Sequence, residues 1–481
     1  MIILFLRRTV SGSNCKEATA PISPSSHLHA WDGLVVEKIS FSSCYKPETV
    51  EGSTFWRHVR EGGPDLWIWM GDNMYKDGYD MDAKRLAYNA AREEASYLLY
   101  GPVAHPAIPV MATWDDHDCC SNNEGNEYPC IRESQKEFAI HLGINSTDPR
   151  HWEYPGVQQE GVYSSSRFRK PFSEEVGLQV MVLDARSGRD PTYSQYGECR
   201  GTNTRMLSEE QWSWLEEQLR QRSEVKVIVS GTQVLPPTDL TRGVEEFCAH
   251  DSHSGGGNSF MDAISAVGEG VEWKGTEYET WAEVPLERLK LLGLAQKTIN
   301  DGYADAVIFL SGDQHWGELM AKQMPASPLY GDPRVLYEVT ASGIMQNWPY
   351  DIENSNRVRE RSADLRGSGP FIHACSFPFI YGGTVYTTCT GADADFDWCS
   401  LEVDAAGAHI PGRWGVCAPP DQEPAQALFS NSSQTCSGSE FHVCSALGNY
   451  GSVAIDYRGR RVRMSVESPL EGELVYHEIV Y

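Results

Sequence analysis

The sequence Ala306-Val-Ile-Phe-Leu-Ser-Gly-Asp-Gln-His-Trp316 joins an apolar run to two side chains of the kind that bind metals. Its first five residues are apolar and largely branched, which predicts a buried β-strand. Asp313 and His315 follow on the turn, so that a carboxylate and an imidazole can face one point. Oxygen and nitrogen donors placed in this way suit a metal ion.

Four other stretches repeat this pattern of an apolar run followed by polar side chains. A single run of this kind is typical of an ordinary strand and turn. In α/β sheets, however, ligands bind outside the carboxyl ends of strands, so five runs together predict one metal-rich site. The four are Leu66–Met70 before Gly71-Asp72-Asn73-Met74-Tyr75, Ile108–Trp114 before Asp115-Asp116-His117-Asp118, Val180–Leu183 before Asp184-Ala185-Arg186, and Val225–Val229 before Ser230-Gly231-Thr232-Gln233.

Strand and helix patterns alternate through most of residues 35–315, which predicts one large α/β domain. We expect the chain to divide into a disordered leader or signal remnant at 1–30, a catalytic core at 31–350, a Cys-rich irregular insertion at 351–445, and strands at 446–481 that complete the core. Helices are expected at 55–60, at 81–100, after the Ser208–Gln211 capping box and from Pro285 to Asn300. Further strands are expected at 35–41, 335–340, 452–457 and 461–466. Residues 119–175 are expected to form an irregular loop.

The composition is that of a soluble globular protein, with 41% hydrophobic and 22% charged residues among 481. The net charge of −27 repels nucleic-acid backbones at long range, so nucleic acid is not expected as a stable partner. No stretch reaches the roughly 20 apolar residues that a membrane span needs. The sequence leaves the oligomeric state open.

Thirteen cysteines suggest an oxidising compartment. The adjacent Cys119 and Cys120 are expected to form disulfides or to be packed in the core. The sequons at Asn145 and Asn431 agree with secretion and glycosylation. Disulfides are also expected among six cysteines of the C-terminal part, namely Cys375, Cys389, Cys399, Cys417, Cys436 and Cys444.

The five strand ends hold the groups that phosphoester hydrolysis requires. Two cations roughly 3.5–4 Å apart can generate a metal-bound hydroxide for in-line attack at phosphorus. Asp72 is placed to bridge such ions, Tyr75 can add a phenolate, and Asp116 or Asp115 can hold the second ion. Asp313 and His315 can complete the two coordination spheres.

Three side chains have two interpretations each. His117 is either a structural histidine tied to a carboxylate or the general acid that protonates the leaving group, and its place within Asp-Asp-His-Asp favours the second. Arg186 is either an internal ion-pair partner of Asp184 or a phosphate ligand. Gln233 either makes a structural hydrogen bond or reaches the substrate site.

The motifs at Asp72–Tyr75, Trp114–Asp118, Leu183–Arg186 and Ser311–His315 resemble those of PhoD-type alkaline phosphatases, which are calcineurin-like metallophosphoesterases with a core similar to that of purple acid phosphatases. The resemblance implies a four-layer α/β/β/α sandwich and a site with ferric iron and calcium. It implies that iron is held by Cys44, Asp72, Tyr75 and His315, and calcium by Asp72, Asp116 and Asp313. It also implies His117 as general acid and Arg186 near the phosphate.

The resemblance leaves several points open. Magnesium, manganese or zinc in place of these metals, and monoester or diester substrates, all remain compatible with the sequence. The substrate is expected to be a small-molecule phosphoester. The alternative is a catalytically silent secreted binding protein that keeps the fold, although its ligand set would then be expected to have gaps.

Overall fold

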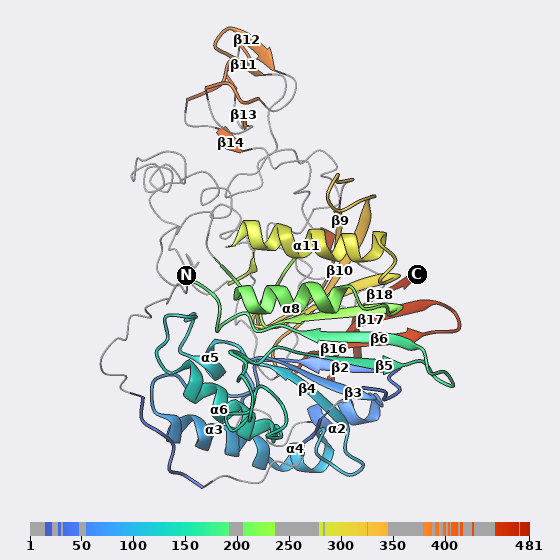
Figure 1. The fold of residues 1–481 in the computed structure, drawn as a ribbon. Helices are drawn as coiled ribbons and strands as arrows, with labels where there is room; N and C mark the ends of the chain where they lie inside the picture. The colour runs from blue at the N-terminus through green and yellow to red at the C-terminus, as the bar shows by residue number, and fades with distance from the viewer. Residues whose placement is uncertain are drawn as a thin grey trace, which may run out of the picture.

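The computed structural model has two seven-stranded sheets that pack face to face between two layers of helices (Figure 1). It describes residues 15–21, 27–29, 32–47, 54–191, 205–235, 279–281, 284–324, 326–344, 448–470 and 472–481, together with short pieces between 379 and 427.

The first sheet combines strands from both ends of the chain. β4, β3 and β2 run parallel to one another, and β16 pairs antiparallel with β2. In spatial order its strands are β1 (Leu28–His29), β4 (Pro109–Thr113), β3 (Leu66–Met70), β2 (Lys38–Ser42), β16 (Tyr450–Asp456), β17 (Arg461–Ser468) and β18 (Gly472–Val480).

The second sheet is built on four parallel strands, β6, β7, β8 and β10. Antiparallel strands flank this parallel centre on both sides. In spatial order the strands are β15 (Gln426–Ala427), β9 (Gly317–Met324), β10 (Arg334–Ala341), β8 (Ala306–Ser311), β7 (Val225–Ser230), β6 (Val176–Val182) and β5 (Ser164–Arg169).

The alternation of side chains along the buried strands produces three cores. In β3, Ile68 and Met70 face the opposite sheet, whereas Trp67 and Trp69 face helices. In the second sheet, Val227 of β7 lies in the core between the sheets and Ile228 lies under helices. One core between the sheets and one outside each sheet define the α/β/β/α sandwich, and the predicted fold class is confirmed.

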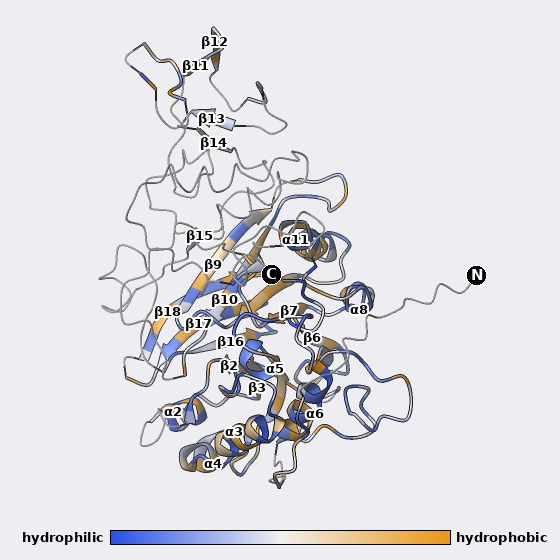
Figure 2. Ribbon diagram, turned by 90° about the vertical axis from the view of Figure 1, so that its left-hand side faces the viewer, coloured by the Kyte–Doolittle hydropathy of each residue, from blue (hydrophilic) through white to orange (hydrophobic). Residues whose placement is uncertain are grey.

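The helices cover the outer faces of the sheets, α2, α3, α4 and α6 on the first and α8 and α11 on the second (Figure 1). They contain both hydrophilic and hydrophobic residues (Figure 2), as expected for helices with one face on a sheet and the other toward solvent. Their bounds are α2 Phe55–Glu61, α3 Met81–Glu93, α4 Ala95–Tyr100, α5 Asp116–Cys119, α6 Ile131–Leu142, α8 Glu209–Leu219 and α11 Pro285–Asn300.

Three local expectations differ from the structure. The helix expected at 81–100 is interrupted at Glu94, whose carboxylate accepts hydrogen bonds from the amides of Ser96 and Tyr97 and so begins α4 as a separate helix. The loop expected at 119–175 contains α6, which buries Phe138 on its sheet-facing side. The third difference lies in the expected leader.

Part of the expected leader is packed on the core over the residues described. Cys15 is disulfide-bonded to Cys130 at the start of α6, and Lys16 forms a bridge with Asp80. β1 then pairs with β4 at the edge of the first sheet. The side chains of the six C-terminal cysteines, the Asn431 sequon and the loop at 250–257 lie outside the described residues.

Candidate active site

Four candidate metal ligands share an unusual backbone conformation at the ends of strands from both sheets. Cys44 after β2, Asp72 after β3, and Asp313 and His315 after β8 have φ values of 62°, 49°, 69° and 58°. Non-glycine residues seldom adopt this left-handed conformation, which costs roughly 1–3 kcal/mol each and is concentrated at functional sites. The two sheets therefore both deliver strained ligand-type residues to the same edge.

Glycines allow these strand ends to approach one another closely. A Cβ atom on Gly71, before Asp72, would lie 2.5 Å from the Cβ of Asp115. A Cβ atom on Gly312, before Asp313, would lie 2.5 Å from the hydroxyl oxygen of Ser43. Larger residues at either glycine would push the ligand-bearing turns apart.

The first ligand group contains Cys44, Asp72 and His315, whose donor atoms lie within 4.8 Å of one another. The Cys44 thiol is 3.7 Å from Oδ2 of Asp72 and 3.1 Å from the hydroxyl of Ser342. The hydroxyl of Tyr75 lies 3.1 Å from Nε2 of His315, which brings a phenol to the same group. Thiol, phenol, carboxylate and imidazole thus converge at one position.

Burial sets the protonation of this group. Burial, followed by the charges of Asp72 and Asp313, holds the pKa of Cys44 well above its ordinary value. Burial and the charge of Lys46 lower the pKa of His315 to about 4, so its imidazole is neutral at pH 7, as metal ligation requires. A thiolate at Cys44 therefore requires a compensating cation.

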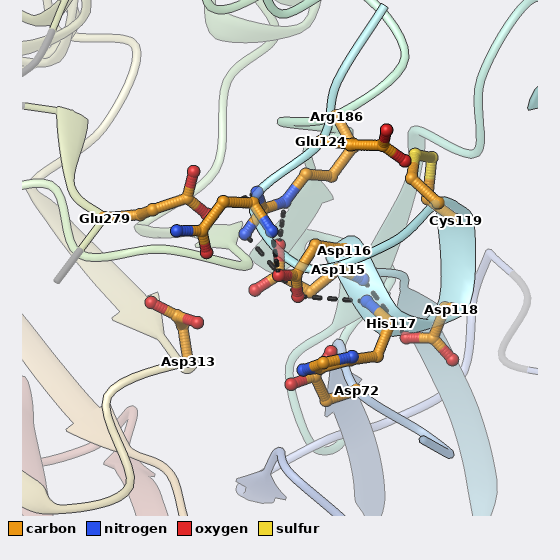
Figure 3. Close-up of polar contacts among 12 residues, drawn as sticks. Asp72, Asp115, Asp116, His117, Asp118, Cys119, Glu124, Arg186, Glu279 and Asp313 are labelled. Atoms are coloured by element: carbon orange, nitrogen blue, oxygen red, sulfur yellow. Dashed lines mark hydrogen bonds and ion pairs between the residues drawn. A yellow bond between two sulfur atoms is a disulfide. The ribbon is translucent and has the colours of Figure 1, made fainter. Parts of the chain in front are cut away.

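Two further groups contain the carboxylates. Asp72 and Asp116 come together with His117, and Asp115 and Asp116 with Asp313, in each case with donor atoms within 4.8 Å. Figure 3 shows Asp313 across from Asp115 and Asp116, with Asp72 below them. Asp72 and Asp116 each belong to two of the three groups, so adjacent cation positions would share ligands.

Some carboxylate oxygens here lack hydrogen-bond donors within the described part of the chain, and the carboxylates lie close to one another, so a bound cation would compensate for both. Asp72 Oδ1 and Asp115 Oδ2 are buried and accept no hydrogen bond from any residue that the structure describes. Burial, together with the neighbouring carboxylates, raises the pKa of Asp115 to about 7 and holds that of Asp313 well above its ordinary range. Buried oxygens without donors, clustered beside like charges, fit divalent or trivalent cations.

The one-turn helix α5 carries His117 to the edge of this cluster. Its Nδ1 lies 2.6 Å from Oδ1 of Asp77, and its ring lies 4.4 Å from the ring of Tyr75. Burial lowers the pKa of His117, but Asp116, Asp72 and Asp77 together outweigh burial and raise it to about 10. No local pattern in the sequence marked Asp77 as the partner of His117.

Asp118, which ends the Asp115–Asp118 motif, makes hydrogen bonds that hold the local fold together. Its carboxylate accepts hydrogen bonds from the backbone amides of Asn73 and Asp115 and from the hydroxyl of Tyr88. It therefore fastens the turn after β3 to the start of α5 and holds Asp72 and His117 in register.

Arg186 is fully buried, and its side chain pairs with Asp115 and Glu279 rather than with Asp184 (Figure 3). Arg186 contributes only its backbone amide to Asp184, at 2.9 Å, and the Asp184 carboxylate also accepts from Val162 and Ser187. Arg189 pairs with the second oxygen of Glu279. No motif in the sequence pointed to Glu279.

Gln233 lies apart from the three ligand groups. Its side-chain amide donates to Glu318 at 3.1 Å and to the hydroxyl of Thr340 at 2.8 Å. These contacts link β9 and β10 beneath the site. Of the sequence-predicted site residues, Arg186 and Gln233 are therefore the two held in structural contacts, while the others surround the cluster.

Together the fold and site define a two-sheet sandwich that gathers ligands for adjacent cations at the carboxyl ends of its strands. Residues 39–375 match the PhoD-like phosphatase family. Because this match covers more than half of the sequence, the chain belongs to that family. A solved structure titled "Structure of PhoD" is similar with a TM-score of 0.42 and 18% identity, over 66% of this chain and 58% of that one.

A second match lies inside the Cys-rich insertion, where residues 375–417 match the fibronectin type II domain. Binder of sperm protein homolog 2 of Mus musculus is 34% identical over 56 residues, which is 12% of this chain and 37% of that protein. The chain thus spans less than two thirds of either relative. From its sequence, this segment was expected only to be Cys-rich and irregular. Within it, β11 (Phe379–Tyr381) pairs with β12 (Thr384–Tyr386), and β13 (Trp398–Ser400) with β14 (Trp414–Val416).

Proposed function

We propose that the chain is a metal-dependent phosphoester hydrolase that acts on phosphomonoesters, phosphodiesters or both. The observation that carries this proposal is the convergence of the Cys44, Asp72 and His315 donors with two overlapping carboxylate groups beside His117. A catalytically silent binding protein would have no need for strained backbone at four of these positions.

The donor chemistry favours two kinds of cation. Cys44, Tyr75 and His315, with Asp72, would hold ferric iron, because thiolate and phenolate ligands suit that metal. Asp72, Asp116 and Asp313 offer only carboxylate oxygens, which suit calcium, with magnesium or manganese as substitutes. When bound, such cations lower the pKa of water and neutralise charge on the phosphoryl oxygens.

His117 is the proposed general acid. Although burial lowers its pKa, the charges of Asp116, Asp72 and Asp77 raise it above the ordinary value, which favours the protonated imidazole that a general acid needs. Asp77 holds Nδ1 at 2.6 Å, which leaves Nε2 to carry a proton to the leaving oxygen.

Arg186 is proposed to act by position rather than by touching phosphate. Its guanidinium pairs with buried Asp115, and its second terminal nitrogen lies 3.9 Å from Asp116. It therefore holds Asp115 in place and lies beside Asp116, one of the three carboxylates proposed to bind calcium. Gln233, whose amide bonds to Glu318 and Thr340, is assigned a structural role.

A secreted location is proposed alongside this activity. The disulfides Cys15–Cys130 and Cys119–Cys120 and the fibronectin type II match support an oxidising compartment. No helix in the described part of the chain is long and apolar enough to cross a membrane.

The deciding experiment is hydrolysis of p-nitrophenyl phosphate and bis-p-nitrophenyl phosphate at pH 9 by the purified chain, with metal analysis of the same sample. Activity that a chelator abolishes and added cations restore supports the proposal. Absence of hydrolysis by a folded, metal-loaded protein would favour the silent binding protein. In His117→Ala we expect kcat to fall by roughly 10²–10⁴ for phenyl phosphate and by less for p-nitrophenyl phosphate, with metal content retained.

A further inference from the structure

Lys84 of α3 is a fully buried lysine outside the groups assigned above. Its ammonium donates hydrogen bonds to three backbone carbonyls, those of His117 at 3.1 Å, Asp118 at 3.2 Å and Cys120 at 2.9 Å. Lysine is almost never fully buried unless its charge is compensated. Here all three acceptors belong to the carboxyl-terminal end of the helix that carries His117.

A one-turn helix such as α5 needs this external support. Forming a single turn is unfavourable by itself, and the last carbonyls of a helix have no partners within it. The carboxyl-terminal end also bears partial negative charge, which a cation stabilises. Asp118 fastens the other end through the amides of Asn73 and Asp115. Both ends of α5 are therefore held by side-chain contacts.

Lys84 also lies near Tyr128, which holds the loop that carries Asp77. Its ammonium lies 5.8 Å from the centre of the Tyr128 ring, within the range of a cation–π interaction. The hydroxyl of Tyr128 donates to the carbonyl of Gly78 at 2.7 Å, directly after Asp77. The Lys84 ammonium thus contacts the helix of His117 directly, and through Tyr128 it is linked to the loop that carries Asp77.

We propose that Lys84 is a positioning residue for the general acid: it fixes the direction of the His117 imidazole by tying down the carbonyl end of α5. The inference rests on the proposed function, because it takes His117 as the proton donor. It assigns Lys84 no contact with substrate or metal.

The test compares Lys84→Met with a matched control, Lys226→Met. Lys226 of β7 is likewise fully buried, and its ammonium donates to the carbonyls of Gln218 at 3.3 Å and Gln221 at 2.5 Å at the end of α8. The same substitution therefore removes a buried lysine that supports a helix end in both cases. Only Lys84 contacts the helix that bears the proposed acid.

In Lys84→Met we expect kcat to fall by roughly 10–10² for phenyl phosphate, and by less for p-nitrophenyl phosphate, whose leaving group needs less protonation. Metal content should stay at the wild-type level. Lys226→Met should lower kcat for both esters by the same small factor. In a His117→Ala background, Lys84→Met should add no further loss, because the two residues act on one step.

Equal losses on both esters, or a pattern that Lys226→Met reproduces, would overturn the inference. If Lys84→Met does not fold, Lys84→Arg replaces it, since a planar guanidinium cannot reproduce the three converging hydrogen bonds and should give a smaller loss of the same selectivity. Should His117→Ala itself lack leaving-group dependence, the general-acid assignment fails. If it shows that dependence and the Lys84 variants do not, only the role of Lys84 is refuted.

Discussion

Replacement of Arg186 by methionine tests whether this arginine stabilises the fold or binds substrate. The guanidinium is fully buried and pairs with Asp115 and Glu279, whose side chains are 1% and 2% exposed. Removing one partner of a buried ion pair costs roughly 3–5 kcal/mol, because the other charge stays buried. Arg189 still pairs with Glu279 in the variant, so we expect a loss of about 3 kcal/mol, at the lower end of that range.

The penalty should depend on pH in a defined direction. The pKa of Asp115 is already raised to about 7 by burial, and loss of Arg186 raises it further. A carboxyl group with a raised pKa binds a proton more tightly in the folded state than in the unfolded state. In the variant, the contribution of Asp115 to the free energy of unfolding therefore falls as pH rises from about 4 toward and beyond 7. The penalty of Arg186→Met should be larger at pH 8 than at pH 5.

Urea unfolding of the cation-free protein, followed by tryptophan fluorescence, measures this loss. Arg85→Met is the control, because Arg85 pairs with Glu137 at 2.7 Å and 2.8 Å, and this pair is also buried but lies between α3 and α6. Both variants should lose comparable stability at pH 8. Only Arg186→Met should lower the kcat of the folded, metal-loaded enzyme. An unchanged urea transition with a higher KM and the wild-type kcat would show instead that Arg186 binds substrate.

Three further predictions concern the ligand cluster and the insertion. Asp77→Asn should move the alkaline limb of the rate profile for phenyl phosphate down by roughly one pH unit, because Asp77 raises the pKa of His117, and an unmoved limb would exclude this pairing in solution. Asp72→Asn should abolish activity and reduce metal content in elemental analysis, whereas Cys44→Ser should remove any visible charge-transfer absorption with most of the activity. Non-reducing peptide mapping should find disulfides among the cysteines of residues 375–444, and six free thiols there would place the protein in a reducing compartment.

Much of the core could be predicted because its strands are short apolar runs that end in polar side chains. β3, β7 and β8 match the predicted runs within a residue, and α11 runs from Pro285 to Asn300 as expected. The hairpin of β16 and β17 was likewise expected from its Arg-Gly-Arg turn. These features depend on local pattern, which the sequence carries directly.

Features that depend on partners distant in sequence could not be predicted in the same way. Glu279 meets Arg186 from 93 residues away, and nothing local marks it. α6 has many polar residues, and part of its buried face is polar, with Glu137 paired to Arg85. The fibronectin type II match concerns a segment whose sequence shows cysteines but no simple period.

The first sheet combines strands from both ends of the chain, so it can be completed only late in synthesis. Ser42 at the end of β2 donates to the carbonyl of Asn449, 407 residues later, and β16 then covers the edge of β2. At ribosomal rates this interval lasts roughly 20–80 s, during which that edge is open. Cys44 is synthesised between Cys15 and Cys130, which pair in a disulfide. His315 is synthesised long before β16, so a nascent chain can assemble the Cys44–Asp72–His315 group, and a cation taken up there would keep Cys44 out of mixed disulfides until the last strands arrive.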